Sequence, residues 1–250
     1  MFKELRPASN SETASTPEFW AANFARSGRL TPWKRFRMRF TGELDVFLRH
    51  LPRGGKVLDA GCGFGEWVTF LRSLGYRAEG LDYSADLVDR LRQEYPGVGW
   101  TVSDIRATPY ADASFDGVIS LGVVEHEEAG PVAALREMRR ILRPGGMAVI
   151  TVPRDIARHR HASALQFPPR QGGEFFQYFM TEEELAGFMR EAGFEPVATG
   201  TLRAPSIMLM APRLAMRLPA KALSLLDLAI SLLFRWTARY DGMIFCAGRR

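Results

Sequence analysis

The sequence predicts an α/β fold with a doubly wound, mostly parallel sheet, and three observations support this prediction. Short apolar runs typical of buried strands alternate with amphipathic segments of helical spacing between residues 55 and 200. Alternate glycines follow the first of these runs, as in turns that lead from a parallel strand into a helix. An aspartate closely follows each of the next two runs. Such alternation favours a sheet covered by helices on both faces.

Length and composition set the outer limits of the prediction. With 250 residues the chain is long enough for one large domain, and we expect residues 17–250 to form it. Residues 1–16 are rich in Ser, Thr and Glu and lack a signal-type apolar segment, so we expect a mobile tail. The net charge of +5 permits nucleic acid, anionic lipid or an anionic substrate as partner without choosing among them. Two cysteines give no disulfide framework, which favours a cytoplasmic location.

Residues 17–50 interleave aromatic and basic side chains. We expect them to form an N-terminal helical cap, with rings packed inward and guanidinium groups in water. The same mixture can bind single-stranded nucleic acid by stacking and charge, and this is the alternative. The helical interpretation is favoured because basic and aromatic residues mix on many ordinary amphipathic helices.

The first predicted strand, residues 57–60, runs into a turn with alternate glycines at Gly61, Gly63 and Gly65. Glycine permits positive φ and lets a ligand lie against the backbone. A dinucleotide-binding turn would have a third glycine where Glu66 stands. The carboxylate of Asp59 beside the turn would repel a pyrophosphate, so the turn suits a cationic ligand.

The stretch from Asp59 to Gly65 resembles the first motif of class I S-adenosylmethionine (SAM) dependent methyltransferases, whose ligand is cationic and has no phosphate. The resemblance covers roughly residues 55–200 and is to the small-molecule, type 11/25-like branch. It implies a Rossmann-like methyltransferase fold, with a seven-stranded sheet, N-terminal helices and a helical insertion before the last strand. It also implies SAM as cofactor, bound in part by Asp59, Gly61, Gly63 and Gly65.

A second strand at residues 77–81 is followed directly by Asp82, which lies 17 residues beyond Gly65. Folds of this type place a ribose-binding carboxylate at a spacing of about 20 residues. The resemblance implies that Asp82 binds the ribose hydroxyls and that Tyr83 flanks the adenine. The alternative is that Asp82 or Ser84 only caps the helix predicted at residues 85–94.

Two further strands end in residues that the resemblance assigns to the cofactor. After the strand at 98–102, it implies that Asp104 accepts from the adenine amino group and that Ile105 packs on the ring. Aspartate is also a common turn residue, which is the other interpretation of Asp104. We further expect Leu121, at the end of the strand at 115–120, to contact the cofactor.

His126 is the titratable residue best placed for chemistry, at the carboxyl end of the fourth strand. An imidazole that titrates near pH ~6.5 can take a proton from a hydroxyl or amine acceptor at neutral pH. We name His126, with Glu125 beside it, as the candidate catalytic residues. The alternative is a structural histidine that holds the loop through a backbone hydrogen bond.

After a helix at 132–142 and a strand at 147–152, the periodicity stops between residues 153 and 181. This loop carries a basic cluster, which could hold an anionic substrate or simply be solvated. Two histidines, His159 and His161, are too few for a metal site, and we expect no metal. Thr181 then opens a helix through a capping box with Glu184.

Two strands, at 194–202 and 241–248, resemble the final antiparallel pair of the family sheet, but residues 203–240 separate them. This insertion is basic, and residues 220–239 have the pattern of an amphipathic helix too polar to span a membrane. It could be a lid, a dimer surface or a peripheral membrane contact.

These features predict a methyltransferase that moves a methyl group from SAM to a small-molecule, lipid-linked or glycan-linked acceptor. The alternative is a noncatalytic module that docks a partner or a membrane through residues 203–240. We expect no nucleic-acid partner, because the chain lacks the Asn-Pro-Pro-Tyr type of sequence found after the fourth strand in adenine-modifying members. The acceptor atom and the oligomeric state do not follow from the sequence.

Overall fold

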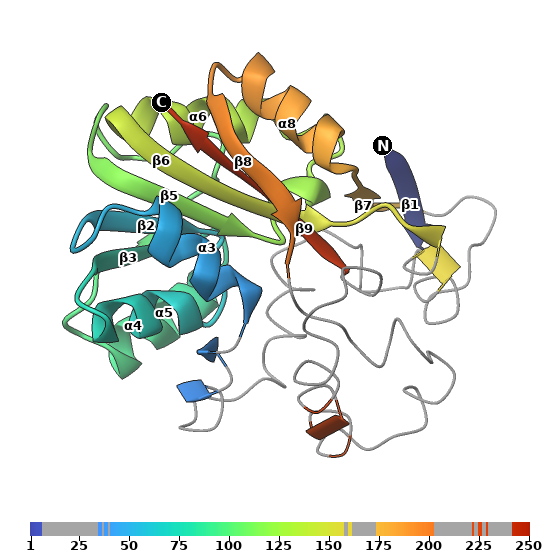
Figure 1. The fold of residues 1–250 in the computed structure, drawn as a ribbon. Helices are drawn as coiled ribbons and strands as arrows, with labels where there is room; N and C mark the ends of the chain where they lie inside the picture. Colours follow the sequence, from blue (N-terminus) through green and yellow to red (C-terminus); the bar gives the residue numbers. More distant parts are fainter. Residues whose placement is uncertain are drawn as a thin grey trace.

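The computed structural model describes residues 1–6, 35–36, 38–39, 41–157, 160–161, 174–202, 222, 225–226, 229 and 242–250. Seven strands form one sheet in the order β4-β3-β2-β5-β6-β9-β8 (Figure 1). These strands are β2 (Lys56–Ala60), β3 (Arg77–Asp82), β4 (Trp100–Val102), β5 (Phe115–Leu121), β6 (Leu142–Pro153), β8 (Glu195–Thr201) and β9 (Met243–Arg249).

The sheet is parallel from β4 to β6, and β9 runs antiparallel to both of its neighbours. This arrangement confirms the predicted doubly wound, mostly parallel sheet of seven strands. The first strand of the parallel part, β2, lies between β3 and β5, so the chain order reverses at this point. Open α/β sheets bind their ligands at the carboxyl ends of the strands beside such a reversal.

Helices cover both faces of the sheet, as Figure 1 shows. One face carries α3 (Gly42–His50), α4 (Glu66–Ser73) and α5 (Ala85–Glu94), and the other carries α6 (Val132–Ile141) and α8 (Glu182–Glu191). Each face has its own apolar core. The large buried side chains of α6 are Leu135, Met138 and Ile141, at the three-residue spacing that places them on one helix face.

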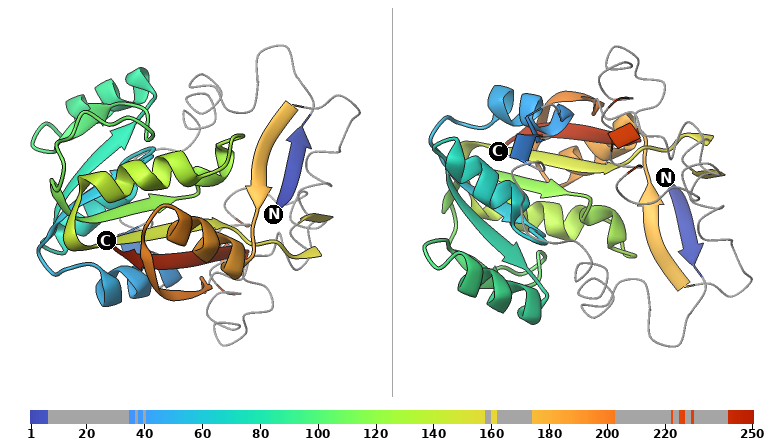
Figure 2. Two further views of the ribbon diagram at one scale, coloured as in Figure 1. Left: turned by 90° about the horizontal axis from the view of Figure 1, so that it is seen from above. Right: turned by 90° about the horizontal axis from the view of Figure 1, so that it is seen from below.

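The chain begins differently from the expected mobile tail. Strand β1 (Phe2–Arg6) pairs antiparallel with β7 (Glu174–Phe179), and Figure 2 shows the two side by side, apart from the main sheet. The prediction for residues 2–6 was wrong because the pairing partner lies about 170 residues away and gives no local signal. The same pairing turns the last part of the expected loop at 153–181 into a strand.

The end of the domain follows the predicted pattern. Thr181 caps α8 through a capping box with Glu184, as the sequence predicts. Strands β8 and β9 pair although the insertion separates them, and Leu202 N–H donates to the Met243 carbonyl at 3.0 Å. Most of the insertion and most of the N-terminal cap lie outside the described residues. Of the helices among the described residues, none is long and apolar enough to cross a membrane.

Candidate functional site

The glycine turn after β2 has the backbone geometry for which glycine is required. Gly61, Gly63 and Gly65 all have positive φ, at 89°, 49° and 65°. The amide groups of Gly61 and Cys62 both donate to the Leu81 carbonyl, at 2.8 and 2.9 Å. The turn is therefore held against the end of β3, at the reversal of strand order.

Neighbouring side chains use the space left by the missing Cβ atoms. A Cβ on Gly61 would lie 2.5 Å from Val123, and one on Gly65 would lie 2.3 Å from Trp100. Val123 directly precedes the short 3-10 turn η1 (Val124–His126) that carries both candidate catalytic residues. The missing Cβ of Gly61 thus lets η1 approach the carboxyl edge of the sheet. Sequence reasoning missed the contacts of Val123 and Trp100 with these glycines, because such packing depends on the fold.

Asp82 links the glycine turn to the following segment. Its side chain is buried, and its Oδ2 accepts from Gly63 N–H while Oδ1 accepts from Ser84 N–H, both at 3.0 Å. Burial raises the pKa of this carboxyl, and the backbone donors oppose that effect. Ser84 stands at the N-cap of α5, but its side chain makes no capping hydrogen bond. Asp82 therefore lies beside the glycine turn, and its role as the ribose ligand stays a prediction.

Asp59 lies beside Asp82 at the end of β2 and is 3% exposed. Burial, and next the charge of Asp82, raise the pKa of Asp59 to about 8. A cationic ligand would offset both effects, because its positive charge would stabilise the ionised carboxylates that burial and mutual repulsion disfavour. Two buried carboxyl groups beside the glycine turn fit a cationic ligand such as SAM, which carries a sulfonium and an ammonium group.

The remaining predicted cofactor residues follow neighbouring strands. Tyr83 is 38% exposed beside the buried Asp82, and Ile105 is a buried residue of the loop after β4. Leu121 ends β5 and is half-buried. The topology therefore brings all of them to the carboxyl edge of the sheet. Their contacts with a cofactor stay predictions.

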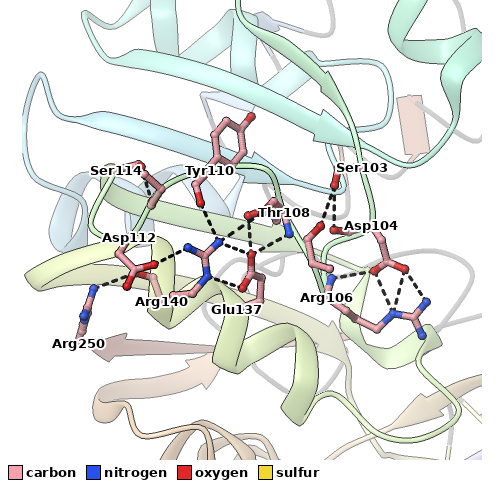
Figure 3. Close-up of polar contacts among 12 residues, drawn as sticks. Ser103, Asp104, Arg106, Thr108, Tyr110, Asp112, Ser114, Glu137, Arg140 and Arg250 are labelled. Atoms are coloured by element: carbon pink, nitrogen blue, oxygen red, sulfur yellow. Dashed lines mark hydrogen bonds and ion pairs between the residues drawn. The ribbon is translucent and has the colours of Figure 1, made fainter.

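Asp104 lies on the predicted edge but is paired with a residue that the sequence did not single out. Its two oxygens accept from the Arg106 backbone N–H at 2.8 Å and from the guanidinium at 2.5 to 3.0 Å (Figure 3). Arg106 also donates to Glu127 at 3.0 Å and lowers the pKa of Asp104. An adenine amino group would have to share this carboxylate with Arg106.

Helix α6 fixes the loop that carries Asp104 (Figure 3). The Glu137 carboxylate accepts from Thr108 N–H at 2.8 Å and from its hydroxyl at 2.6 Å. Arg140 donates to Glu137 at 2.7 Å, to Asp112 at 2.5 Å and to the Tyr110 carbonyl at 2.8 Å. These donors hold the pKa of Glu137 at about 2. The loop is thus tied to the domain core by hydrogen bonds from a single helix.

Glu125 is buried within η1 and is 2% exposed. Burial raises the pKa of its carboxyl to about 8, and among the described residues its Oε2 has no hydrogen-bond partner. At neutral pH the group is therefore mostly protonated. In that form it is a proton donor rather than a base.

His126 faces strand β7. Its Nδ1 lies 2.8 Å from the Phe176 carbonyl oxygen, and the two rings meet edge to face at 5.1 Å. Because a carbonyl can only accept, Nδ1 carries a proton and donates it. In the neutral ring this leaves the lone pair on Nε2, which is the form a proton acceptor needs. The contact also fits the structural role weighed for this histidine, and the sequence did not reveal Phe176.

The basic cluster after β6 is described only in part. Arg154 pairs with Glu182 at 3.5 Å and Arg160 with Asp155 at 3.2 Å, while the rest of the cluster lies outside the described residues. Within the described part of the chain, no three His, Cys, Asp or Glu side chains are grouped to hold a metal ion.

Known proteins match the chain in its central part. Residues 58–150 match the family described as "Methyltransferase domain" (Methyltransf_11). A probable SAM-dependent methyltransferase of Mycolicibacterium smegmatis is 32% identical over 59% of this chain and 55% of its own length. A malonyl-[acyl-carrier protein] O-methyltransferase of Erwinia pyrifoliae is 35% identical over 52% of this chain and 50% of its own.

A third relative acts on RNA according to its name. The tRNA (carboxymethyluridine(34)-5-O)-methyltransferase of Xenopus tropicalis is 36% identical over 50% of this chain, but over only 18% of its own length. The chain thus spans about half the length, or less, of these curated relatives. The expectation of no nucleic-acid partner is not confirmed by such relatives.

Solved structures extend the similarity to nearly the whole chain. A Haloferax volcanii methyltransferase solved in complex with the Trm112 activator has a TM-score of 0.63 at 21% identity, covering 94% of this chain and 97% of its own. A Burkholderia thailandensis N1-methyltransferase with bound S-adenosylhomocysteine has a TM-score of 0.56 at 19% identity, covering 99% and 95%. The family match of residues 58–150, the relatives and the shared fold together support a SAM-dependent methyltransferase domain of type 11.

Proposed function

We propose that this protein transfers the methyl group of SAM to a small-molecule, lipid-linked or glycan-linked acceptor. The observation that carries the proposal is the pair of buried carboxyl groups, Asp59 and Asp82, beside the glycine turn. Burial and the charge of Asp82 raise the pKa of Asp59 to about 8; a bound cation would favour its ionised form, whereas a pyrophosphate would oppose it. A noncatalytic module would not need to keep two buried acids in this arrangement.

Bound SAM supplies a methyl group that is already activated by its positive sulfur. The protein therefore contributes mainly by orienting the reactants and excluding water. In this proposal Asp82 holds the ribose hydroxyls, Asp59 faces the cationic end, and Asp104 and Ile105 bind the adenine. His126 lies on η1, and η1 can approach this edge of the sheet because Gly61 has no Cβ.

The acceptor decides whether a base is needed. A hydroxyl or amine acceptor must lose a proton, which His126 can take on Nε2. A carboxylate acceptor is already ionised at neutral pH and needs no base. Two relatives are named for O-methylation of malonyl and carboxymethyluridine groups, both of which contain a carboxyl. Carboxylates therefore belong in the acceptor panel beside hydroxyls and amines.

A nucleic-acid acceptor is the second candidate, favoured by the tRNA methyltransferase among the relatives and by the net charge of +5. We further propose that the protein acts in the cytoplasm, in keeping with its two free, buried cysteines. Contact with a membrane surface through residues 203–240 would fit a lipid-linked acceptor.

The first experiment is calorimetric titration of the purified protein with SAM and S-adenosylhomocysteine. We expect clear binding that Asp82→Ala weakens strongly and that Asp86→Ala, an exposed acid in the next helix, leaves unchanged. Labelled SAM is then offered with separate fractions of small metabolites, lipids and tRNA. Absence of SAM binding in the intact protein would contradict the proposal and favour an interaction module.

The second experiment uses His126→Gln to sort the acceptor chemistry. With a hydroxyl or amine acceptor, we expect kcat to fall by about 10²–10⁴-fold while SAM affinity is kept. With a carboxylate acceptor the same variant should keep most of its activity. Loss of SAM binding in His126→Gln would show that the residue supports the cofactor site instead.

A further inference from the structure

We propose that strand β1 is a positioning element for His126: acting through β7, it holds the imidazole in the tautomer that leaves Nε2 able to accept a proton. The proposal deepens the proposed function and rests on it, since His126 must face the acceptor for the tautomer to matter in catalysis. Four observations on the described residues support it.

The first observation is a buried polar link between the two strands. Gln177 Nε2 donates to Glu4 Oε2 at 2.6 Å, and the two side chains are only 9% and 8% exposed. The two residues also lie opposite each other in the strand register. A hydrogen bond to a carboxylate in a buried place is strong, and losing one partner leaves the other unsatisfied. Glu4 therefore fixes where Gln177, and with it the neighbouring Phe176, must lie.

The second observation is an irregularity in the pairing. Glu4 is opposite Gln177, but the next residue, Leu5, is opposite Phe175. Phe176 is thus the extra residue of a β-bulge in β7. Bulges change the direction of the residue that they add and are common beside active sites. It is the carbonyl of this residue that accepts from His126 Nδ1, at 2.8 Å.

The third observation is a second attachment just after the catalytic turn. Tyr178 donates its hydroxyl proton to the Glu128 carbonyl at 2.9 Å, and Lys3 pairs with the Glu128 carboxylate at 2.7 Å. The β1–β7 pair therefore contacts the segment around η1 at His126 and again at Glu128. A shift of the strand pair would move both contacts together.

The fourth observation is chemical. A neutral imidazole has one protonated nitrogen, and the hydrogen bond that the ring makes decides which one. A carbonyl at Nδ1 selects the Nδ1–H form, because it accepts and cannot donate. If β7 were not held, this selection would weaken and part of the population would carry the proton on Nε2. That part could not act as a base.

The test reads the tautomer directly. Nitrogen-15 NMR of histidine distinguishes the two neutral tautomers, and His126→Gln identifies the signal among the four histidines of the chain. At about pH 8, where an ordinary imidazole is neutral, we expect a single Nδ1–H tautomer in the intact protein. Glu4→Ala should give a mixture, whereas Leu5→Ala, an exposed change on the same strand, should keep the single form.

Activity provides the second readout. We expect Glu4→Ala to lower kcat about tenfold or more while the KM for SAM stays unchanged, and Glu4→Gln, which keeps an acceptor for Gln177, to restore most of the loss. An Nε2–H tautomer in the intact protein would overturn the proposal. So would an unchanged tautomer in Glu4→Ala when hydrogen exchange shows that β7 has opened. Because the tautomer is read without any acceptor, failure here is distinguishable from failure of the proposed function.

Discussion

At the scale of single residues, the two buried carboxyl groups beside the glycine turn, Asp59 and Asp82, have raised pKa values. Asp59 and Asp82 are close enough for the charge of one to raise the pKa of the other. Both are buried, so neither gains much from solvent. A bound cation changes this balance, and cofactor binding should therefore be coupled to protonation.

We expect SAM affinity to rise with pH until about pH 8 and then to level off. Below its pKa of about 8, Asp59 is protonated in the free protein and must lose its proton to face a cation. Affinity should then rise by up to about tenfold per pH unit. Calorimetry in buffers with different ionisation enthalpies measures the released proton. Asp59→Asn should remove both effects, and an unchanged proton release in that variant would contradict the assignment.

The buried Glu125 should make folding stability depend on pH. Its pKa is raised from 4.5 to about 8 by burial, so the folded state keeps a proton that the unfolded chain loses near pH 4.5. Folding stability should therefore fall as pH rises through this window. Glu125→Gln, of similar shape and always neutral, should lose less stability between about pH 5 and about pH 8. Thermal melts of both proteins across that range measure the difference, and parallel curves would refute it.

At the scale of elements, α6 determines the position of the loop that carries Asp104. We expect Glu137→Ala to lower the free energy of unfolding by about 1–3 kcal/mol, since Thr108 and Arg140 lose their acceptor. SAM affinity should fall as well, because the loop carries Asp104. Arg136→Ala is the control. Arg136 is an exposed residue of the same helix, and its side chain pairs with Glu191 at 3.7 Å and not with the loop.

The contribution of Glu137 to the free energy of unfolding should depend on pH. The pKa of Glu137 is lowered from 4.5 to about 2, so its contribution is present above pH 4.5 and is lost as the pH falls toward about 2. The gap between the intact protein and Glu137→Ala should therefore close in acid. Denaturant titrations at several pH values check this, and a gap that is constant with pH would contradict the assigned contacts.

Elements with local signals were predictable from the sequence, and those that depend on distant partners were not. The capping box of α8 lies within four residues, and the strand before the glycine turn has its own apolar pattern. Asp82 could be located by its spacing from Gly65. The contact between Arg106 and Glu127 could not, because it joins residues 21 apart in the chain. The bulge at Phe176 needs the register with β1, which only the fold provides.

At the scale of the whole molecule, the predicted cofactor residues and the two strands that flank the insertion belong to opposite parts of the sheet. Asp59, Asp82 and Asp104 follow β2, β3 and β4, whereas residues 203–240 separate β8 and β9 at the other edge. The ends of β8 and β9 meet through the hydrogen bond between Leu202 and Met243. A short hairpin turn could therefore join them directly.

We expect a variant with residues 203–240 replaced by a four-residue Gly/Ser turn to fold and to bind SAM as the intact protein does. If the insertion recognises the acceptor, methyl transfer to it should be lost at the same time. Circular dichroism and calorimetry measure the first expectation, and transfer of labelled methyl measures the second. Loss of SAM binding in a folded variant would show that the insertion reaches the cofactor site.

The pairing of β1 with β7 also sets an order for events during synthesis. Between Arg6 and Phe179 the ribosome adds about 170 residues, which takes roughly 10–35 s at ordinary rates of elongation. During that time the first strand has been made but has no partner, while β2, β3, β4 and β5 have already emerged with the glycine turn. The nascent chain should therefore form the glycine turn and its neighbouring strands before β1 pairs with β7, so that SAM could bind and stabilise a domain in which His126 does not yet contact Phe176.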